Sequence, residues 1–162
     1  MFCIYMEVFY NGKLMKDGDF LKVSETQKEP KIKINVNAND LYTLILFDPD
    51  AVGGTHIHLS IINITNNDIK TGNIIIPYKG PAPPPGTGKH RYIFGLYKQD
   101  REIFSEPLNE RQIEIDNLKN KLNLYEKPIF ETKFISQNES GGRKRRKTRR
   151  RKNKKLKITR RR

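Results

Sequence analysis

An almost uninterrupted apolar run from Tyr42 to Phe47, followed at once by Asp48-Pro49-Asp50, constrains the fold of this chain more than any other feature. The run is rich in residues that favour strands, and it is far shorter than the ~20 apolar residues that span a bilayer. A strand that is apolar at successive positions is typical of the middle of a sheet covered on both faces. The sequence therefore predicts a central strand that ends in carboxylates.

Other short runs bounded by turn residues predict further strands. They cover residues 6–10, 13–15, 31–36, 59–64, 73–76, 92–97 and 128–136. One helix is predicted over 109–124, where apolar residues recur at mostly helical spacing between two prolines. The expected fold is an all-β, or β-dominated, sandwich with one late helix.

The positive charge is concentrated in a C-terminal tail. Fifteen of the 32 Lys and Arg residues lie between Arg143 and Arg162, which leaves 17 basic and 18 acidic residues in the first 142. We expect a folded domain over residues 1–139, and a Gly hinge with a disordered Lys/Arg-rich tail over 140–162. The residues expected to contact nucleic acid or an import receptor are Arg143, Lys144, Arg145, Arg146, Lys147, Arg149, Arg150 and Arg151. Anionic membrane is a third candidate partner of the tail.

The N-terminal residues and the cysteine count suggest a compartment. The single Cys3 excludes an intramolecular disulfide and a cysteine-rich zinc module. Residues 1–7 lack the basic start of a signal peptide and contain an acid. The sequence therefore predicts an intracellular protein, cytoplasmic or nuclear, that is not secreted and has no transmembrane segment.

Three segments place ionisable side chains at the ends of strand-like runs. They are Asp48-Pro49-Asp50, His58 with the strand that follows it, and His90-Arg91-Tyr92 after a loop rich in Pro and Gly. Two carboxylates that point into one cleft repel each other, so one of them should have a raised pKa or a cationic partner. A neutral imidazole can donate to an anion from one nitrogen while its other nitrogen is held by Asp. The three strand ends can converge into one small polar pocket.

Each residue type also has a simpler interpretation. Asp48-Pro49-Asp50 can cap a turn, and His58 or His90 can be a packed, hydrogen-bonded residue. Arg91 follows a pocket-lining histidine on a strand, so it should point to the other face and form a structural, buried ion pair. His56 can line the same cleft or face solvent.

Together these segments resemble the phosphatidylethanolamine-binding protein family over about residues 41–99. The matching residues are Asp48-Pro49-Asp50, His58 with the strand to Asn63, and Gly80 through Tyr92. The family usually has a proline where this chain has Val52. We expect a trans bond there, because a cis bond before a residue other than proline costs about 2.5–4 kcal/mol.

The resemblance implies a function and a set of site residues. It implies a monomeric, non-enzymatic module, without cofactor or metal, that binds a phospholipid headgroup, a phosphate or a phosphorylated side chain and regulates a partner protein. The residues that it assigns to the ligand site are Asp48, Pro49, Asp50, His58, Gly80, Ala82, His90 and Tyr92.

Two alternatives remain at the level of sequence. Asp48, Asp50, His58 and His90 could bind a divalent metal and hydrolyse an ester, although no serine or cysteine nucleophile accompanies these motifs. The chain could also be a nucleic-acid-associated protein that acts mainly through its basic tail.

Overall fold

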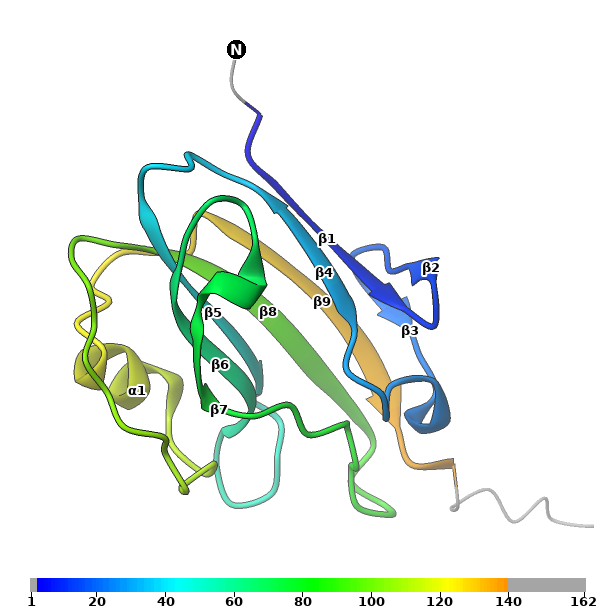
Figure 1. The fold of residues 1–162 in the computed structure, drawn as a ribbon. Helices are drawn as coiled ribbons and strands as arrows, with labels where there is room; N and C mark the ends of the chain where they lie inside the picture. The colour runs from blue at the N-terminus through cyan, green and yellow to red at the C-terminus, as the bar shows by residue number, and fades with distance from the viewer. Residues whose placement is uncertain (1–2, 140–162) are drawn as a thin grey trace, which may run out of the picture.

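The structure, a computed structural model, describes residues 3–139 of the chain. Over this range nine strands, one α-helix and two short 3-10 helices form the fold (Figure 1). The elements are β1 (Tyr5–Tyr10), β2 (Lys13–Leu14), β3 (Asp19–Phe20), η1 (Val23–Glu25), β4 (Lys31–Asn35), β5 (Leu41–Asp48), β6 (His56–Ile64), η2 (Ile69–Thr71), β7 (Asn73–Ile76), β8 (Lys89–Gln99), α1 (Ile115–Lys121) and β9 (Phe130–Gln137). The predicted domain boundary at 139 and the predicted contacts from Arg143 to Arg151 lie outside the described residues.

Two sheets and one helical layer make up the part of the chain from residue 3 to residue 139 (Figure 1). The larger sheet has six strands in the order β3-β9-β8-β5-β6-β7, and the smaller has three in the order β2-β1-β4. The smaller sheet packs on one face of the larger sheet, while α1 and the segments around it cover the opposite face. The predicted β-dominated sandwich with one late helix is confirmed within residues 3–139.

The position of the central strand β5 in the fold explains its apolar sequence. Leu44 and Leu46 lie in the cluster between the two sheets, and Ile45 and Phe47 lie in the cluster beneath α1. Because successive side chains on a strand point to opposite faces, a strand with two covered faces has no polar side. Burial of both faces is the reason that this run contains almost no polar residue.

The helix is shorter than its periodicity predicts. It spans Ile115–Lys121 instead of 109–124, and the preceding residues run beside the start of β6. The backbone N–H of Ile57 donates to the carbonyl of Arg111 at 2.7 Å, and His56 forms a β-bridge with Gln112. Strand β7 pairs only with residues 60–62 of β6, so the first residues of β6 have free backbone groups. Pairing with those groups takes precedence over helix formation.

Smaller differences lie at the other strand ends. Strand β6 begins at His56 and β8 runs from Lys89 to Gln99, both longer than predicted. Strand β3, which was not predicted, adds two residues in parallel to β9. No cis peptide bond occurs in the described residues, so the bond before Val52 is trans as expected.

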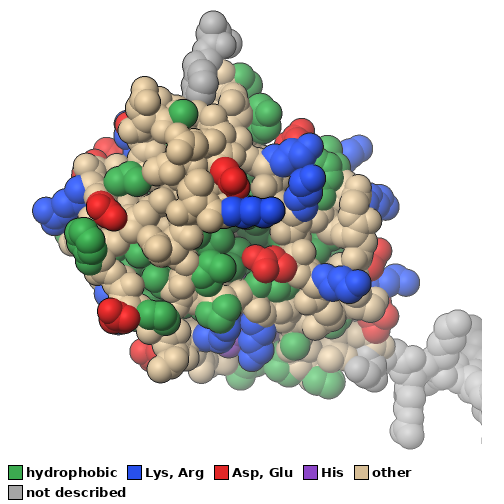
Figure 2. Space-filling model, viewed as in Figure 1, with side chains coloured by type: hydrophobic (Ala, Val, Ile, Leu, Met, Phe, Trp, Pro, Cys, Tyr) green, Lys and Arg blue, Asp and Glu red, His purple; other side chains and the backbone are tan. Residues whose placement is uncertain are grey.

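The surface of the domain carries both signs of charge. On the face shown in Figure 2, basic and acidic side chains are interspersed, as expected from their nearly equal numbers in the first 142 residues. No helix formed by the described residues has the length and apolar content needed to cross a bilayer.

Candidate functional site

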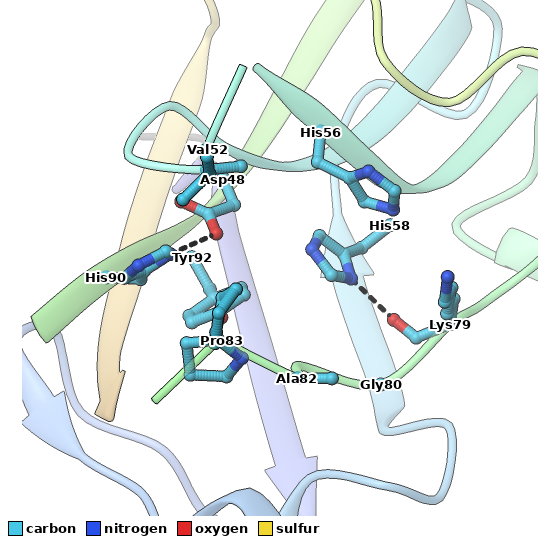
Figure 3. Close-up of a pocket in the computed structure, with 12 residues that line it drawn as sticks. Asp48, Val52, His56, His58, Lys79, Gly80, Ala82, Pro83, His90 and Tyr92 are labelled. Carbon is cyan, nitrogen blue, oxygen red and sulfur yellow. Dashed lines mark hydrogen bonds and ion pairs between the residues drawn. The ribbon is translucent and has the colours of Figure 1, made fainter. Parts of the chain in front are cut away.

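The order of three strands brings the polar strand ends together. Strand β5 lies between β6 and β8, and Asp48 at its end is in register with His56 of β6. On the other side, Phe47 is in register with Ile93 of β8, which places Tyr92 level with Asp48 and His90 beyond the end of β5. These ends surround a cavity of about 180 Å³ (Figure 3).

A β-bulge turns His58 toward this cavity. Leu46 of β5 is in register with Leu59, but Phe47 is in register with Ile57, so His58 is an extra residue without a partner on β5. Bulges re-aim side chains and are frequent beside functional sites. Ile57 faces the cluster under α1, whereas His56 and His58 both line the cavity.

Asp48 and His90 form a buried pair at one wall of the cavity. The carboxylate Oδ2 of Asp48 lies 2.7 Å from Nδ1 of His90, and the two side chains are 4% and 1% exposed. The other carboxylate oxygen accepts the backbone N–H of Asp50 at 2.8 Å. Nε2 of His90 lies 2.7 Å from the hydroxyl of Thr87. Both imidazole nitrogens of His90 are thus occupied, which fixes its ring.

The ring of His58 is fixed from the opposite wall. Its Nδ1 lies 2.7 Å from the carbonyl oxygen of Lys79. A carbonyl can only accept, so Nδ1 is the donor and carries a proton. Burial lowers the pKa of His58 to about 4, with Lys79, His56 and Arg111 lowering it further and the hydrogen bond opposing them. His58 is therefore neutral at physiological pH.

Two cationic side chains lie near the paired histidines. The rings of His56 and His58 are 4.8 Å apart between centroids. Burial lowers the pKa of His56, and the charges of Lys79 and Arg111 lower it further. Neither Lys79 nor Arg111 forms an ion pair with an acid of the described residues. The histidine side of the cavity therefore carries a positive field.

Tyr92 connects the cavity to the core. Burial and the hydrogen-bonded Asp48 carboxylate raise the pKa of Tyr92. Its ring stacks on Phe134 with centroids 5.0 Å apart, and the ring of His58 is T-shaped to it with centroids 5.2 Å apart. The position of the cavity wall thus depends on the packing between the two sheets.

Most of the predicted ligand residues line the cavity. Those that do are Asp48, His58, Gly80, Ala82, His90 and Tyr92. Pro49 and Asp50 do not line it, contrary to the prediction. Strand β5 ends at Asp48 and the chain turns, so the strand alternation that would point both carboxylates one way no longer applies at Asp50.

Asp50 instead pairs with Arg91 outside the cavity. Its carboxylate accepts from Nε and Nη2 of Arg91, each at 2.8 Å, and from the Arg91 backbone N–H at 2.9 Å. The expectation that Arg91 faces away from His90 and pairs with a carboxylate matches this geometry. The expectation of burial is wrong, because the Arg91 side chain is 53% exposed. The two carboxylates point apart and take separate partners, His90 and Arg91.

Six residues outside the predicted ligand set also line the cavity. They are Ala51, Val52, His56, Lys79, Pro83 and Pro84. His56 could have been assigned from its spacing of two residues from His58 on a strand. The others come from two loops whose conformations leave no periodic signal in the sequence.

The described residues offer no set of metal ligands. Among residues 3–139, no three His, Cys, Asp or Glu side chains form a group that could hold a metal ion. The metal-binding alternative combined Asp50 with the other three residues, and Asp50 is directed to Arg91.

Fold and site define a class of protein: a β-sandwich with one small polar cavity at the ends of its central strands. The chain belongs to the phosphatidylethanolamine-binding protein family, whose model matches residues 7–127. A phosphatidylethanolamine-binding protein from Plasmodium vivax is similar in structure, with a TM-score of 0.67, 19% identity and coverage of 83% of this chain and 85% of that chain. The carboxypeptidase Y inhibitor, solved in complex with its cognate proteinase, has a TM-score of 0.66, 22% identity and coverage of 83% of each chain. These two likenesses show the shared fold.

A protein with a similar sequence contradicts the predicted cellular location. The "26 kDa secreted antigen" of Toxocara canis is 35% identical over 107 residues, which are 62% of this chain and 41% of that protein. The chain thus aligns with less than half the length of this relative. Because that protein is named as secreted, the prediction of an intracellular, cytoplasmic or nuclear protein is contradicted. The single cysteine was a poor guide, since a protein without disulfides can occur in either compartment.

Proposed function

We propose that the cavity binds a small anion and that the domain is a non-enzymatic module that regulates a protein partner. The observation that carries this proposal is the pair of histidines on β6 beside two cations without acidic partners, Lys79 and Arg111. Such a field favours an anion in a partly enclosed site, where solvent screens charge weakly. Family membership supports the same class of function.

The size of the cavity limits the ligand to a small group. A volume of about 180 Å³ is below the ~300–1,000 Å³ that is typical of pockets for drug-sized ligands. A phosphate, the phosphoryl part of a phospholipid headgroup and a phosphorylated side chain fit this space, and a whole lipid does not. These ligands share an anionic phosphoryl group.

A protein partner is supported by a structural neighbour. The carboxypeptidase Y inhibitor carries the same fold and was solved with its cognate proteinase. We propose that the present domain also acts on a protein partner through the surface around the cavity mouth.

The side chains around His90 favour binding over catalysis. Thr87, His90 and Asp48 form a hydrogen-bonded line that resembles the nucleophile, base and acid of a hydrolase. The single hydroxyl proton of Thr87, however, is donated to the carbonyl of Pro84 at 2.8 Å and not to His90, and Thr87 does not line the cavity. In this proposal Thr87 anchors the 80–88 loop to β8 and attacks no substrate.

Titration with phosphate tests the anion site. The chain has three histidines, and all three line the cavity, so the imidazole resonances report on this site alone. We expect millimolar phosphate to shift the signals of His56, His58 and His90 in a saturable manner. The basic tail can bind phosphate as well, but it contains no histidine. Unchanged imidazole signals at that concentration would contradict the proposed function.

A further inference from the structure

The second ring nitrogen of His58 presents a lone pair to the cavity. Because Nδ1 holds the proton and donates to the Lys79 carbonyl, the Nε2 atom of the neutral ring is an acceptor. In Figure 3 this nitrogen faces the interior, toward the side where Asp48 and His90 lie. It has no hydrogen-bond partner within residues 3–139. A ligand that fills the cavity removes water from Nε2 and must replace the bond.

The wall opposite His58 adds a second acceptor. The Asp48 carboxylate lines the cavity and is 4% exposed. Its two oxygens accept from the Asp50 backbone and from His90, and as carboxylate oxygens they can accept a further bond but donate none. A fully deprotonated anion has only acceptor atoms, so it would place lone pairs against both walls. Buried polar groups left without a partner weaken binding strongly.

The charges nevertheless favour an anion over a cation. The charged or titratable groups that face His58 are Asp48 from β5, His56 from β6, Lys79 from the loop after β7, His90 and Tyr92 from β8, and Arg111 from the segment before α1. Lys79 and Arg111 both disfavour a further positive charge on His56 and His58. An ammonium group would meet the same repulsion. The ligand must therefore be an anion that also carries a hydrogen-bond donor.

On the basis of the proposed anion site, we propose that the cavity selects the singly protonated form of a phosphomonoester. Its P–OH group donates to Nε2 of His58, and its remaining oxygens face the positive field of Lys79 and Arg111. A phosphomonoester has a second pKa near ~6, so the protonated form is abundant at neutral pH. A sulfate and a phosphodiester carry no such proton. His58 is thus the residue that determines specificity among phosphoryl and sulfuryl groups.

The pH dependence of affinity tests this selection. In the full chain, binding of O-phosphoserine, dimethyl phosphate and inorganic sulfate is measured from the His58 resonances between pH 5.5 and 8. We expect the Kd of O-phosphoserine to be nearly constant below about pH 6 and to rise about tenfold per pH unit above it, as the protonated form is depleted. Sulfate and dimethyl phosphate should bind at least about tenfold more weakly at pH 6 and show no such rise, because they cannot replace the lost bond.

A matched variant isolates the lone pair. In His58→Asn the side-chain amide can still donate to the Lys79 carbonyl, but Nε2 is absent. With the His56 and His90 resonances as the readout, we expect the preference for O-phosphoserine over sulfate to fall below about threefold and the pH slope to disappear. The basic tail is the same in both proteins, so its own anion binding cancels from the comparison.

Each other outcome overturns a particular step. If sulfate and dimethyl phosphate also bind more tightly as the pH falls, the proton resides on His58 and not on the ligand, and the inference is wrong. If glycerophosphoethanolamine binds as tightly as O-phosphoserine at pH 8, an ammonium is the donor, and the inference is again wrong. Binding of O-phosphoserine without pH dependence refutes the inference but leaves the anion site intact. If no anion shifts any imidazole, the proposed function itself fails.

Discussion

Replacing Asp48 with alanine is expected to lower the free energy of unfolding by about 3–5 kcal/mol, the cost of removing one partner of a buried pair. The carboxylate is 4% exposed and bonds to the His90 ring and the Asp50 backbone. Its removal leaves two polar groups, the His90 ring and the Asp50 backbone N–H, without their partner in a buried site. Since domains are typically stable by 5–15 kcal/mol, much of the native stability depends on this side chain.

Asp50→Ala is the matched control for this experiment. This variant removes the carboxylate that lies two residues after Asp48 and pairs with Arg91. Both partners of that pair are partly exposed, Arg91 at 53% and Asp50 at 29%. Exposed pairs contribute about 1 kcal/mol or less, because solvent screens them. Urea unfolding followed by circular dichroism measures both losses. Equal losses for the two variants would contradict the assignment of Asp48 as the buried anchor.

The control has its own pH dependence. The hydrogen bonds from Arg91 lower the pKa of Asp50 below that of an unfolded carboxyl. A depressed pKa in the folded state means that the stabilisation is present above the unfolded pKa, about 3.9, and is lost as the pH falls through the folded value. The difference in stability between Asp50→Ala and the unmodified chain should therefore shrink only in strong acid.

Phe134→Ala is expected to cost about 3–5 kcal/mol and also to weaken the cavity wall. The ring is fully buried between the two sheets and contacts Tyr10 at 5.4 Å, Phe94 at 6.3 Å and Tyr92 at 5.0 Å between centroids. The cavity left behind lies directly under Tyr92, which lines the ligand site. We therefore expect both a lower urea midpoint and changed His58 resonances in the absence of ligand.

Phe104→Ala makes the same chemical change on the surface. Phe104 is 89% exposed, so its loss should change the free energy of unfolding by less than about 0.5 kcal/mol and leave the imidazole resonances unmoved. The comparison separates the effect of losing a buried, packed ring from the effect of losing any phenyl ring. A Phe134→Ala variant that unfolds like the surface variant would show that the two sheets do not rely on this ring.

Local sequence was sufficient where a residue's role follows from its own strand. The run from Tyr42 to Phe47 is apolar on both sides, and both sides are buried. Asp48 and His90 could be assigned because each ends or begins a strand in an ordered set of motifs that matches a known family. His56 could have been assigned by the same alternation. The inferences about the central strand and His56 need only the period of a strand, and those about Asp48 and His90 also need the order of the motifs.

Sequence failed where the chain leaves a regular element or meets another segment. The turn after Asp48 directs Asp50 to Arg91, and pairing with the free start of β6 replaces the first turns of the predicted helix. Both results depend on which backbone groups a distant segment leaves unpaired. Local spacing contains no information about those groups.

The sequence by itself determined the β-dominated class of this protein, its central strand and six of the residues that line the cavity. Only the tertiary structure decided how those side chains are bonded. The strand order β8-β5-β6 places Asp48 between His90 on one side and His56 and His58 on the other. The Lys79 carbonyl decides which nitrogen of His58 carries the proton. The physical reason is that hydrogen bonds are directional and short, so donor and acceptor roles are fixed only when distant segments come within 3 Å.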